Sequence, residues 1–357
     1  MFNIKIKPYT LNFCFDATTS RGTLNTKQGF YVYLSHSQVR TDTGASVGVG
    51  EIPILVGLSP DDRPDFTQVL DEICEKINKT EDFYSFNEII KKCALSVPAV
   101  AFGLETALMD MAQKGTKMIF KNDFSVGKAP IAINGLIWMG TKEFMYEQIK
   151  EKIKENYTCI KLKIGAIDFN EELNLLKYIR EQFSADDMIL RVDANGAFAP
   201  ENALEKLKQL SEFEIHSIEQ PIKNGQINEM ASLCQNSPIP IALDEELISA
   251  GIYRKKRKLI QDIKPQFLVL KPSLLGGFEA TDEFVDIAEE NCIGWWATSA
   301  LEGNIGLNAI AQWTASKNYV GYQGLGTGQL YENNINSPLK VENGYIYYDN
   351  KVTWGEV

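Results

Sequence analysis

The sequence has no continuous run of about 18 apolar residues, which is the length that a membrane-spanning helix requires. Its first residues, MFNIKIKPYT, interleave Lys5 and Lys7 with apolar side chains and so lack the apolar core of a signal peptide. The six cysteines stand singly, without a CxxC pair, which is typical of free thiols in a reducing compartment. These absences predict a cytoplasmic protein with no membrane partner.

The chain also has fewer basic than acidic residues. The chain has 36 Lys and Arg against 47 Asp and Glu, a net charge of −11. Nucleic acids favour a basic face, so the composition argues against a nucleic-acid partner. The one basic run, RKKRK from Arg254 to Lys258, is therefore interpreted as the solvated face of a helix. A small molecule is the expected partner, and the motifs below indicate that it carries a carboxylate; the oligomeric state is left open.

Between Lys161 and Lys271, five short apolar runs each end in a charged residue. The runs are CIKLKIG, MILRVDANG, IHSIEQP, PIALDEE and FLVLKP, and their charged ends are Lys163, Asp193, Glu219, Asp244 and Lys271. These ends are spaced 30, 26, 25 and 27 residues apart, which fits one parallel strand, one crossover helix and two loops per unit. Such units close into a barrel whose strand ends form the catalytic face. The five charged side chains are thus expected to meet at one mouth.

The rest of the chain suggests how the barrel is framed. Alternating strand patterns up to about residue 58, followed by helical patterns at 66–78, 85–93 and 98–115, predict an α+β capping domain over residues 1–125. A strand at 129–137, a helix at 141–156, and strands at 292–301 and 318–326 extend the barrel to eight strands over residues 126–325. No final helix follows. The fold class is therefore α/β, a (β/α)7β TIM-type barrel, and residues 326–357, with a hairpin turn at Asn343-Gly344, are predicted to pack back on the capping domain.

Side-chain direction predicts a metal site. Residues two apart on a strand share a face, so Asp193 points into the barrel, and Glu219 and Asp244 are expected beside it. Three carboxylates in a buried mouth repel one another strongly, and a divalent cation relieves that repulsion. Oxygen ligands without His or Cys suit Mg²⁺, or Mn²⁺, rather than zinc.

The lysines supply an acid/base pair. Lys161 and Lys163 lie two apart on one strand, and a lysine beside a metal and another ammonium has a lowered pKa, so it can act as a base. Lys271 is expected to face Lys163 across the mouth. Proton removal next to a carboxylate creates an enediolate, whose charge a metal stabilises.

These residues carry a family resemblance. The motifs KLK at 161–163, DAN at 193–195, IEQP with Glu219, LDEE with Asp244 and LKPSLLGG with Lys271 resemble the muconate-lactonising-enzyme subgroup of the enolase superfamily over essentially the whole chain. Within it, RVDANGAF, TSALEGNIGLNAIAQW and GLGTGQLY are most similar to the o-succinylbenzoate synthases of menaquinone biosynthesis. The resemblance implies Mg²⁺ on Asp193, Glu219 and Asp244, with Lys163 as acid/base and Lys271 stabilising the enediolate.

The reaction that the resemblance implies is a carbon-oxygen lyase step. Water would leave 2-succinyl-6-hydroxy-2,4-cyclohexadiene-1-carboxylate by syn elimination through an enediolate. N-succinylamino acid racemisation and muconate cycloisomerisation use the same residues and stay open, as does a catalytically silent metabolite-binding protein. Dipeptide epimerases of the subgroup carry acidic residues in the last barrel strand. Here that strand reads GYQGLGTG, which argues against a cationic dipeptide and for an anionic tail held by backbone N–H groups.

Further residues near these motifs are candidates for substrate contacts or for orienting the charged groups. Asn195 and Glu245 adjoin predicted metal ligands and are interpreted as groups that orient them. Arg191, two residues before Asp193, is expected to steady a carboxylate. Thr298 and Ser299 end the seventh strand, 27 residues past Lys271, and Gly324 lies another 26 residues on. The two hydroxyl residues are candidates to contact the carboxylates of the substrate.

Overall fold

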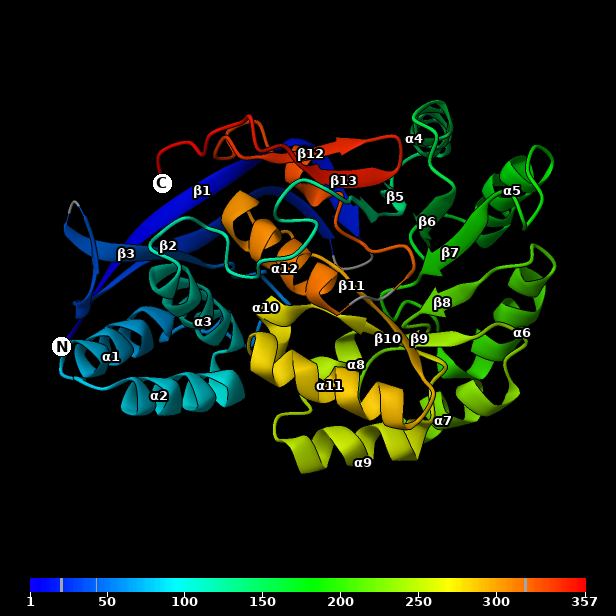
Figure 1. The fold of residues 1–357 in the computed structure, drawn as a ribbon. Coiled ribbons are helices and arrows are strands. Elements are labelled where there is room, and N and C mark those ends of the chain that lie inside the picture. Colours follow the sequence, from blue (N-terminus) through cyan, green and yellow to red (C-terminus); the bar gives the residue numbers. More distant parts are fainter. Residues whose placement is uncertain (20–21, 43, 318–319) are drawn as a thin grey trace.

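A computed structural model describes residues 1–19, 22–42, 44–317 and 320–357 of the chain. Figure 1 shows an antiparallel sheet with three helices on one side of the molecule and a parallel sheet surrounded by helices on the other. No helix among the described residues is long and apolar enough to cross a membrane.

The N-terminal region is a three-stranded antiparallel sheet in the order β1-β2-β3, as expected. Its elements are β1 (Phe2–Thr19), β2 (Gly22–Thr41), β3 (Gly44–Ile52), α1 (Phe66–Asn78), α2 (Phe83–Ser96) and α3 (Pro98–Ala112). Helix α3 packs directly on β3 because Gly48 and Gly50 carry no side chain there. A Cβ on Gly48 would lie 2.0 Å from the carbonyl oxygen of Ala107.

The second region is a parallel sheet of seven strands, ordered β5 to β11 along the chain. The strands are β5 (Gly135–Ile137), β6 (Cys159–Lys163), β7 (Ile189–Asp193), β8 (Ser217–Glu219), β9 (Ile241–Leu243), β10 (Phe267–Leu270) and β11 (Gly294–Ala297). The helices are α4 (Lys142–Lys154), α5 (Phe169–Arg180), α6 (Pro200–Ser211), α7 (Ile227–Asn236), α8 (Glu245–Ile248), α9 (Tyr253–Ile263), α10 (Pro272–Leu275), α11 (Phe278–Glu290) and α12 (Asn304–Ser316). The alternation of strand and helix gives the (β/α)7β barrel that the spacing predicts.

The expected eighth strand is reduced to two bridging residues. Gln323 forms a parallel bridge with Ile133, and Gly324 forms one with Thr298, so the two residues join the β5 side of the sheet to the β11 side. Residues 318–319 of that run lie outside the described residues. The chain leaves the sheet soon afterwards through a glycine-rich turn into the short helix η1 (Thr327–Gln329).

The strand expected at 129–137 is likewise divided, into β4 (Ile131–Ala132) and β5. The backbone changes hydrogen-bond partners between them. The Ile133 amide donates to the carbonyl of Gly344 at 2.9 Å, whereas the Asn134 amide donates to that of Gln323 at 2.9 Å.

The C-terminal segment contacts both regions. The expected hairpin is present as β12 (Leu339–Glu342) and β13 (Tyr345–Tyr348), and β13 pairs with β4. The capping sheet is contacted before the hairpin, where the Glu332 amide donates to Asn12 O at 3.0 Å. It is contacted again by Trp354, which packs in a cluster with Tyr31. The predicted domain boundaries at residues 125 and 325 stay predictions.

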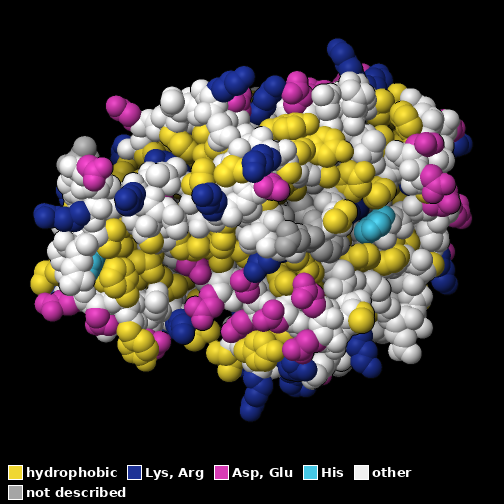
Figure 2. Space-filling model, in the orientation of Figure 1, with side chains coloured by type: hydrophobic (Ala, Val, Ile, Leu, Met, Phe, Trp, Pro, Cys, Tyr) yellow, Lys and Arg dark blue, Asp and Glu magenta, His cyan; other side chains and the backbone are white. Residues whose placement is uncertain are grey.

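Figure 2 shows basic side chains dispersed among acidic ones on the face drawn, rather than gathered into one patch. The basic run on α9 is largely paired. Arg257 lies 2.6 Å from Glu290, and Lys256, which is buried, lies 2.8 Å from Glu283. The run therefore helps to pack α9 against α11 and is also partly exposed to solvent.

A buried carboxylate joins the capping sheet to the barrel. Glu51 of β3 is 0% exposed, and its Oε1 accepts from the Gly303 amide and from the Tyr9 hydroxyl, both at 2.6 Å. Its Oε2 accepts from the Gly306 amide at 2.8 Å. These amides lie at the start of α12, where the first N–H groups have no partner inside the helix and the dipole favours negative charge. Glu51 therefore caps a barrel helix from the other region.

Replacing Glu51 by Ala should lower the free energy of unfolding by about 3 kcal/mol, because two buried amides and one hydroxyl lose their acceptor. Denaturant unfolding measures this. The matched control is Glu75→Ala on α1, whose side chain is 74% exposed. That variant should stay within about 0.5 kcal/mol of the parent. Equal effects of the two substitutions would contradict the capping role of Glu51.

Candidate active site

The charged ends of the barrel strands meet at the mouth of the barrel. The parallel register sets Lys163 beside Asp193 and Asp193 beside Glu219, so the ends of β6, β7 and β8 are level. Asp244 and Lys271 directly follow β9 and β10. With Lys161, one inward position below Lys163, these six side chains are all buried. The structure thus brings together the residues that the sequence placed at one mouth.

Each ammonium group in the mouth contacts a carboxylate. Lys161 Nζ lies 2.7 Å from Glu219 Oε2 and 3.3 Å from Asp193 Oδ2. Lys163 Nζ lies 2.9 Å from Asp193 Oδ2. Lys271 Nζ bonds to Asp244 and lies 3.8 Å from Glu219 Oε1. Buried charges require this kind of compensation, since each loses its hydration on burial.

The two lysines that flank the mouth differ in how easily they lose a proton. Burial lowers the pKa of Lys163, and the neighbouring ammonium of Lys161 lowers it further, against the opposing charge of Asp193. Burial also acts to lower the pKa of Lys271, but Asp244 and Glu219 outweigh it, so this pKa is raised. Lys163 is therefore the better base, and Lys271 the more persistent cation.

The three carboxylates have the chemistry of a hard-cation site. Glu219 Oε1 is buried and has no hydrogen-bond donor among the described residues. Burial raises the pKa of Asp244, and the neighbouring charge of Glu245 raises it further, against the opposing charge of Lys271. As they stand, no three Asp, Glu, His or Cys side chains in the described chain are close enough to hold a metal. Lys161 and Lys271 each lie between two carboxylates and supply the positive charge. The oxygen donors fit Mg²⁺ by type.

Asn195 connects the base to the surrounding loops. Its Oδ1 accepts from Lys163 Nζ at 2.7 Å, and its Nδ2 donates to Glu245 Oε1 at 3.0 Å. Its own amide donates to Asp193 Oδ1 at 3.0 Å. A left-handed backbone, with φ of 43°, aims the side chain this way, and asparagine tolerates that region better than most residues. Asn195 thus contacts the charged groups, and the interpretation that it orients them stays a prediction.

Gln220 was not singled out in the sequence, although it follows Glu219 directly. It is fully buried, and its Oε1 accepts from the Asp244 amide at 3.1 Å and from the Glu246 amide at 3.4 Å. Its φ of 40° is again left-handed. The side chain therefore fixes the backbone that carries Asp244. Only its position beside a predicted ligand could have suggested this.

Arg191 has partners other than the expected carboxylate. Its Nη1 donates to the carbonyl of Tyr322 at 2.9 Å, and its guanidinium stacks on the ring of Trp296 at 4.0 Å. The expectation that it steadies a carboxylate is not supported by these contacts. It links the β7 side of the barrel interior to the segment that takes the place of the eighth strand.

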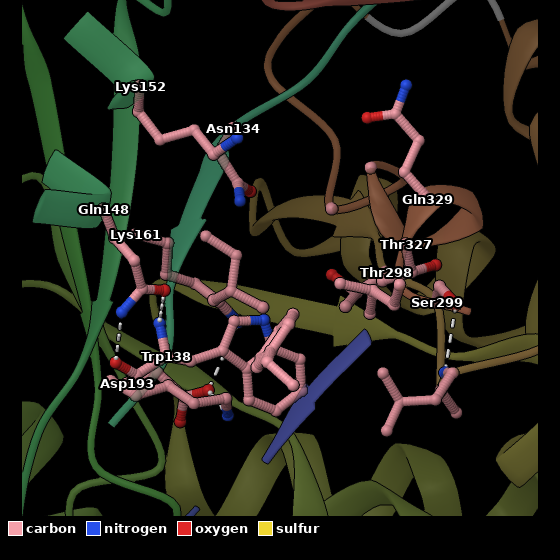
Figure 3. A pocket seen from close by; sticks show the side chains of 18 of the residues that line it. Asn134, Trp138, Gln148, Lys152, Lys161, Asp193, Thr298, Ser299, Thr327 and Gln329 are labelled. Carbon is pink, nitrogen blue, oxygen red and sulfur yellow. Dashed lines mark hydrogen bonds and ion pairs between the residues drawn. The ribbon is translucent and has the colours of Figure 1, made fainter. Parts of the chain in front are cut away.

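A cavity of about 390 Å³ opens above the charged groups (Figure 3). Its lining includes the charged residues Lys163, Asp193 and Lys271 together with Thr298, Ser299 and Gly324. The capping sheet contributes residues such as Phe15, and the following loop contributes Leu55. The cavity is thus built by both regions of the chain. Ser299 is committed to its own loop, because its hydroxyl donates to Glu302 and accepts from the Leu301 amide.

Comparison with known proteins gives a consistent set of relatives. A family model described as "Enolase C-terminal domain-like" matches residues 145–353, more than half of the chain. An o-succinylbenzoate synthase of Desulfotalea psychrophila is 44% identical over 355 residues, covering 92% of this chain and 94% of the relative. The crystal structure of MenC from that organism has a TM-score of 0.84 at 42% identity, covering 97% of this chain and 99% of the other. An N-succinylamino acid racemase of Thermus thermophilus is 33% identical over 44% of this chain and 40% of the relative.

Lys161→Met should destabilise the protein by about 3 kcal/mol or more, because two buried carboxylates lose their shared cation. Added Mg²⁺ should recover much of that loss by compensating the same carboxylates. Urea unfolding with chelator and then with Mg²⁺ measures both effects.

The control for that substitution is Lys256→Met, a second buried lysine that faces one carboxylate with a side chain 36% exposed. Because water can still solvate Glu283, this variant should lose less stability, and Mg²⁺ should not restore it. The same Mg²⁺ response in both variants would rule out the mouth carboxylates as its source.

Proposed function

The chain belongs to the enolase C-terminal domain-like family, and from this membership and the geometry of its site we propose that it is an o-succinylbenzoate synthase. The observation that carries the proposal is the buried pair Lys163 and Lys271, set around three carboxylates at the barrel mouth. The sequence similarity to a synthase over nearly the full length of the chain supports the same conclusion. The reaction dehydrates 2-succinyl-6-hydroxy-2,4-cyclohexadiene-1-carboxylate, a step of menaquinone biosynthesis. The predicted cytoplasmic location stays a prediction.

Lys163 removes the proton next to the ring carboxylate in this proposal. Its lowered pKa favours the neutral amine, and its contacts with Asn195 and Asp193 direct Nζ toward the mouth. After it takes the proton, the same ammonium can deliver it to the departing hydroxide. One group that acts first as base and then as acid on a single face accounts for a syn elimination.

Lys271 keeps its positive charge for the enediolate. Asp244 and Glu219 raise its pKa, so the ammonium persists while negative charge develops on the substrate. A fixed cation in a buried site stabilises such charge strongly, because no solvent must reorganise around it.

Asp193, Glu219 and Asp244 are the residues that would hold a divalent cation. Enolase-superfamily enzymes generally depend on Mg²⁺, and Mn²⁺ has similar ligand preferences. When bound, the ion supplies positive charge to the substrate carboxylate. The protein's own part is to aim the ligands, which Gln220 does through the Asp244 backbone and Asn195 through the Asp193 carboxylate.

Racemisation of N-succinylamino acids is the second candidate. Two lysines around one carbon can exchange its proton on both faces, and the partial likeness to a racemase favours weighing this reaction. N-succinylamino acids and the proposed substrate both carry a succinyl group, so both reactions require a cavity that accommodates this group.

The direct test follows ultraviolet absorbance while the purified protein meets the cyclohexadiene substrate, with Mg²⁺ and then with excess chelator. Metal-dependent formation of o-succinylbenzoate is the expected result. Without conversion, proton exchange of N-succinylamino acids in deuterated water would establish the racemase instead. Failure of both would leave a metabolite-binding protein.

Lys163→Ala should reduce kcat by roughly 10²- to 10⁴-fold, the usual contribution of a positioned acid/base group. Lys177→Ala, on the exposed surface of α5, serves as the control and should keep the parent rate. Product binding, measured by calorimetry, should survive in both. A near-normal rate for Lys163→Ala would overturn its role.

A further inference from the structure

A second cavity, of about 570 Å³, lies beside the one that the three lysines line. The two are called the side cavity and the lysine cavity below. The side cavity is lined by Gly57 and Leu58 of the capping region and by residues from the loops that follow β6, β7, β8 and β9. The proposed reaction makes no use of this cavity, although it lies at the same end of the barrel.

The side cavity adjoins the segments that carry the three carboxylates. Asn195, Gln220 and Glu245 line it, and each follows one of the predicted metal ligands by one or two positions in the chain. The Asn195 amide donates to the carboxylate of Asp193, and the Gln220 side chain accepts from the amide of Asp244. The side cavity therefore borders the groups that would hold a divalent cation.

Side chains separate the two cavities. Asn195 and Leu58 line both of them. Asn195 Nδ2 donates to Glu245 Oε1 at 3.0 Å, and this bond joins the loop after β7 to the start of α8. Side chains change rotamer without any movement of the strands. Once the Asn195–Glu245 bond opens, the carboxylates can be approached from two sides.

The buried charges of the two cavities differ in sign. Lys161, Lys163 and Lys271 line the lysine cavity together with Asp193. Three ammonium groups in a poorly solvated space attract an anionic substrate and repel a cation. The side cavity instead has the buried carboxylate of Glu245, which attracts a cation.

The other charged residues in the described lining are less buried. In the lysine cavity they are Glu151, Lys152 and Glu155, and Lys152 lies 2.6 Å from Glu155. In the side cavity the other one is Lys223, which is exposed and has its backbone against Gly196, where a Cβ would lie 2.9 Å from Lys223 Cα. Water and salt screen exposed charges, so the buried groups dominate the field at the inner ends.

A hydrated magnesium ion fits the side cavity. Mg²⁺ is octahedral and gives up its waters reluctantly, so it travels with about six of them. At about 30 Å³ for each water, the hydrated ion takes roughly 200 Å³, less than half of the cavity. Asn224 and Ser249 add exposed polar side chains to the lining, to which these waters can bond.

We propose that the divalent cation reaches Asp193, Glu219 and Asp244 through the side cavity. Glu245 attracts the ion, and the bond between Asn195 and Glu245 opens to let it pass. The anionic substrate enters through the lysine cavity. Separate routes keep the cation away from three ammonium groups, and they allow the metal to exchange while substrate or product fills the lysine cavity. This inference rests on the metal site of the proposed function.

The test measures two association rates in a variant that narrows the side cavity. Ser249→Trp should slow Mn²⁺ association roughly 10-fold or more, because it obstructs the path along which a buried charge speeds the cation. The Kd for Mn²⁺ should stay at the parent value, since a narrowed route slows entry and exit alike. Association of o-succinylbenzoate, with Mg²⁺ at saturation, should match the parent. Stopped-flow mixing measures both rates, with a fluorescent indicator for free Mn²⁺ and tryptophan fluorescence for o-succinylbenzoate, since Trp138 lines the lysine cavity.

Gln329→Trp is the matched control. Like Ser249, Gln329 is exposed and uncharged, but it lines the lysine cavity (Figure 3). This variant should slow o-succinylbenzoate association and leave Mn²⁺ association unchanged. Asn224→Trp provides a second obstruction of the side cavity, so a folding failure of Ser249→Trp does not decide the question.

Unchanged Mn²⁺ association in the variants that narrow the side cavity would overturn the route. Slower Mn²⁺ association with a correspondingly weaker Kd would also overturn it, because that result means damage to the metal site. Turnover of the cyclohexadiene substrate by the parent protein separates the two conclusions. If the parent turns over and the Mn²⁺ rates are unaffected, the route fails and the synthase stands. If the parent binds no Mn²⁺, the route and the metal site fail together.

Discussion

Charge compensation at the barrel mouth is the constraint on which the rest of the site depends. Lys161, Lys163 and Lys271 face three carboxylates, and every member of the set is buried. Apolar side chains of similar size would fill a barrel at no greater cost, since a buried ion pair often gains less than its desolvation costs. Stability therefore does not explain the set. The set matters for the chemistry, because the neighbouring charges lower the pKa of Lys163 and raise that of Lys271.

The mouth is held in shape by the capping sheet as well as by the barrel. Lys27 of β2 is buried, and its ammonium donates to the carbonyl of Ala300 at 2.9 Å. The Tyr331 hydroxyl donates to the next carbonyl, that of Leu301, at 2.7 Å, and Leu301 has a left-handed φ of 65°. Together with Glu51 at the start of α12, these bonds fix the loop that follows β11. A site built across two regions in this way requires both to be folded.

The sequence predicted that the charged side chains gather at one mouth, and it did so for a physical reason. Parallel strands repeat at a nearly constant interval, and alternate residues share a face, so Lys163, Asp193 and Glu219 could be aligned without any tertiary information. Arg191 also points inward, but its partners come from Tyr322 and Trp296, which are distant in the chain and carry no carboxylate. Local spacing does not determine such partners.

The eighth strand and the polar cavity residues Asn134 and Thr327 had weaker signals in the sequence. The expected strand is reduced to bridges because its neighbours change partners at Ile133 and because glycines turn the chain toward η1. Asn134 has no motif around it, and Thr327 lies within GLGTGQLY, which carried only the family resemblance. The fold alone shows that Asn134 Oδ1 and Thr327 Oγ1 are buried around one cavity without a partner among the described residues.

The charged groups at the barrel mouth do not by themselves select one substrate. Lysines around a carboxylate-binding site suit any reaction that begins with proton removal beside a carboxylate, so they do not by themselves distinguish dehydration from racemisation. Discrimination between substrates arises where buried polar groups are satisfied by one ligand and left unpaired by another.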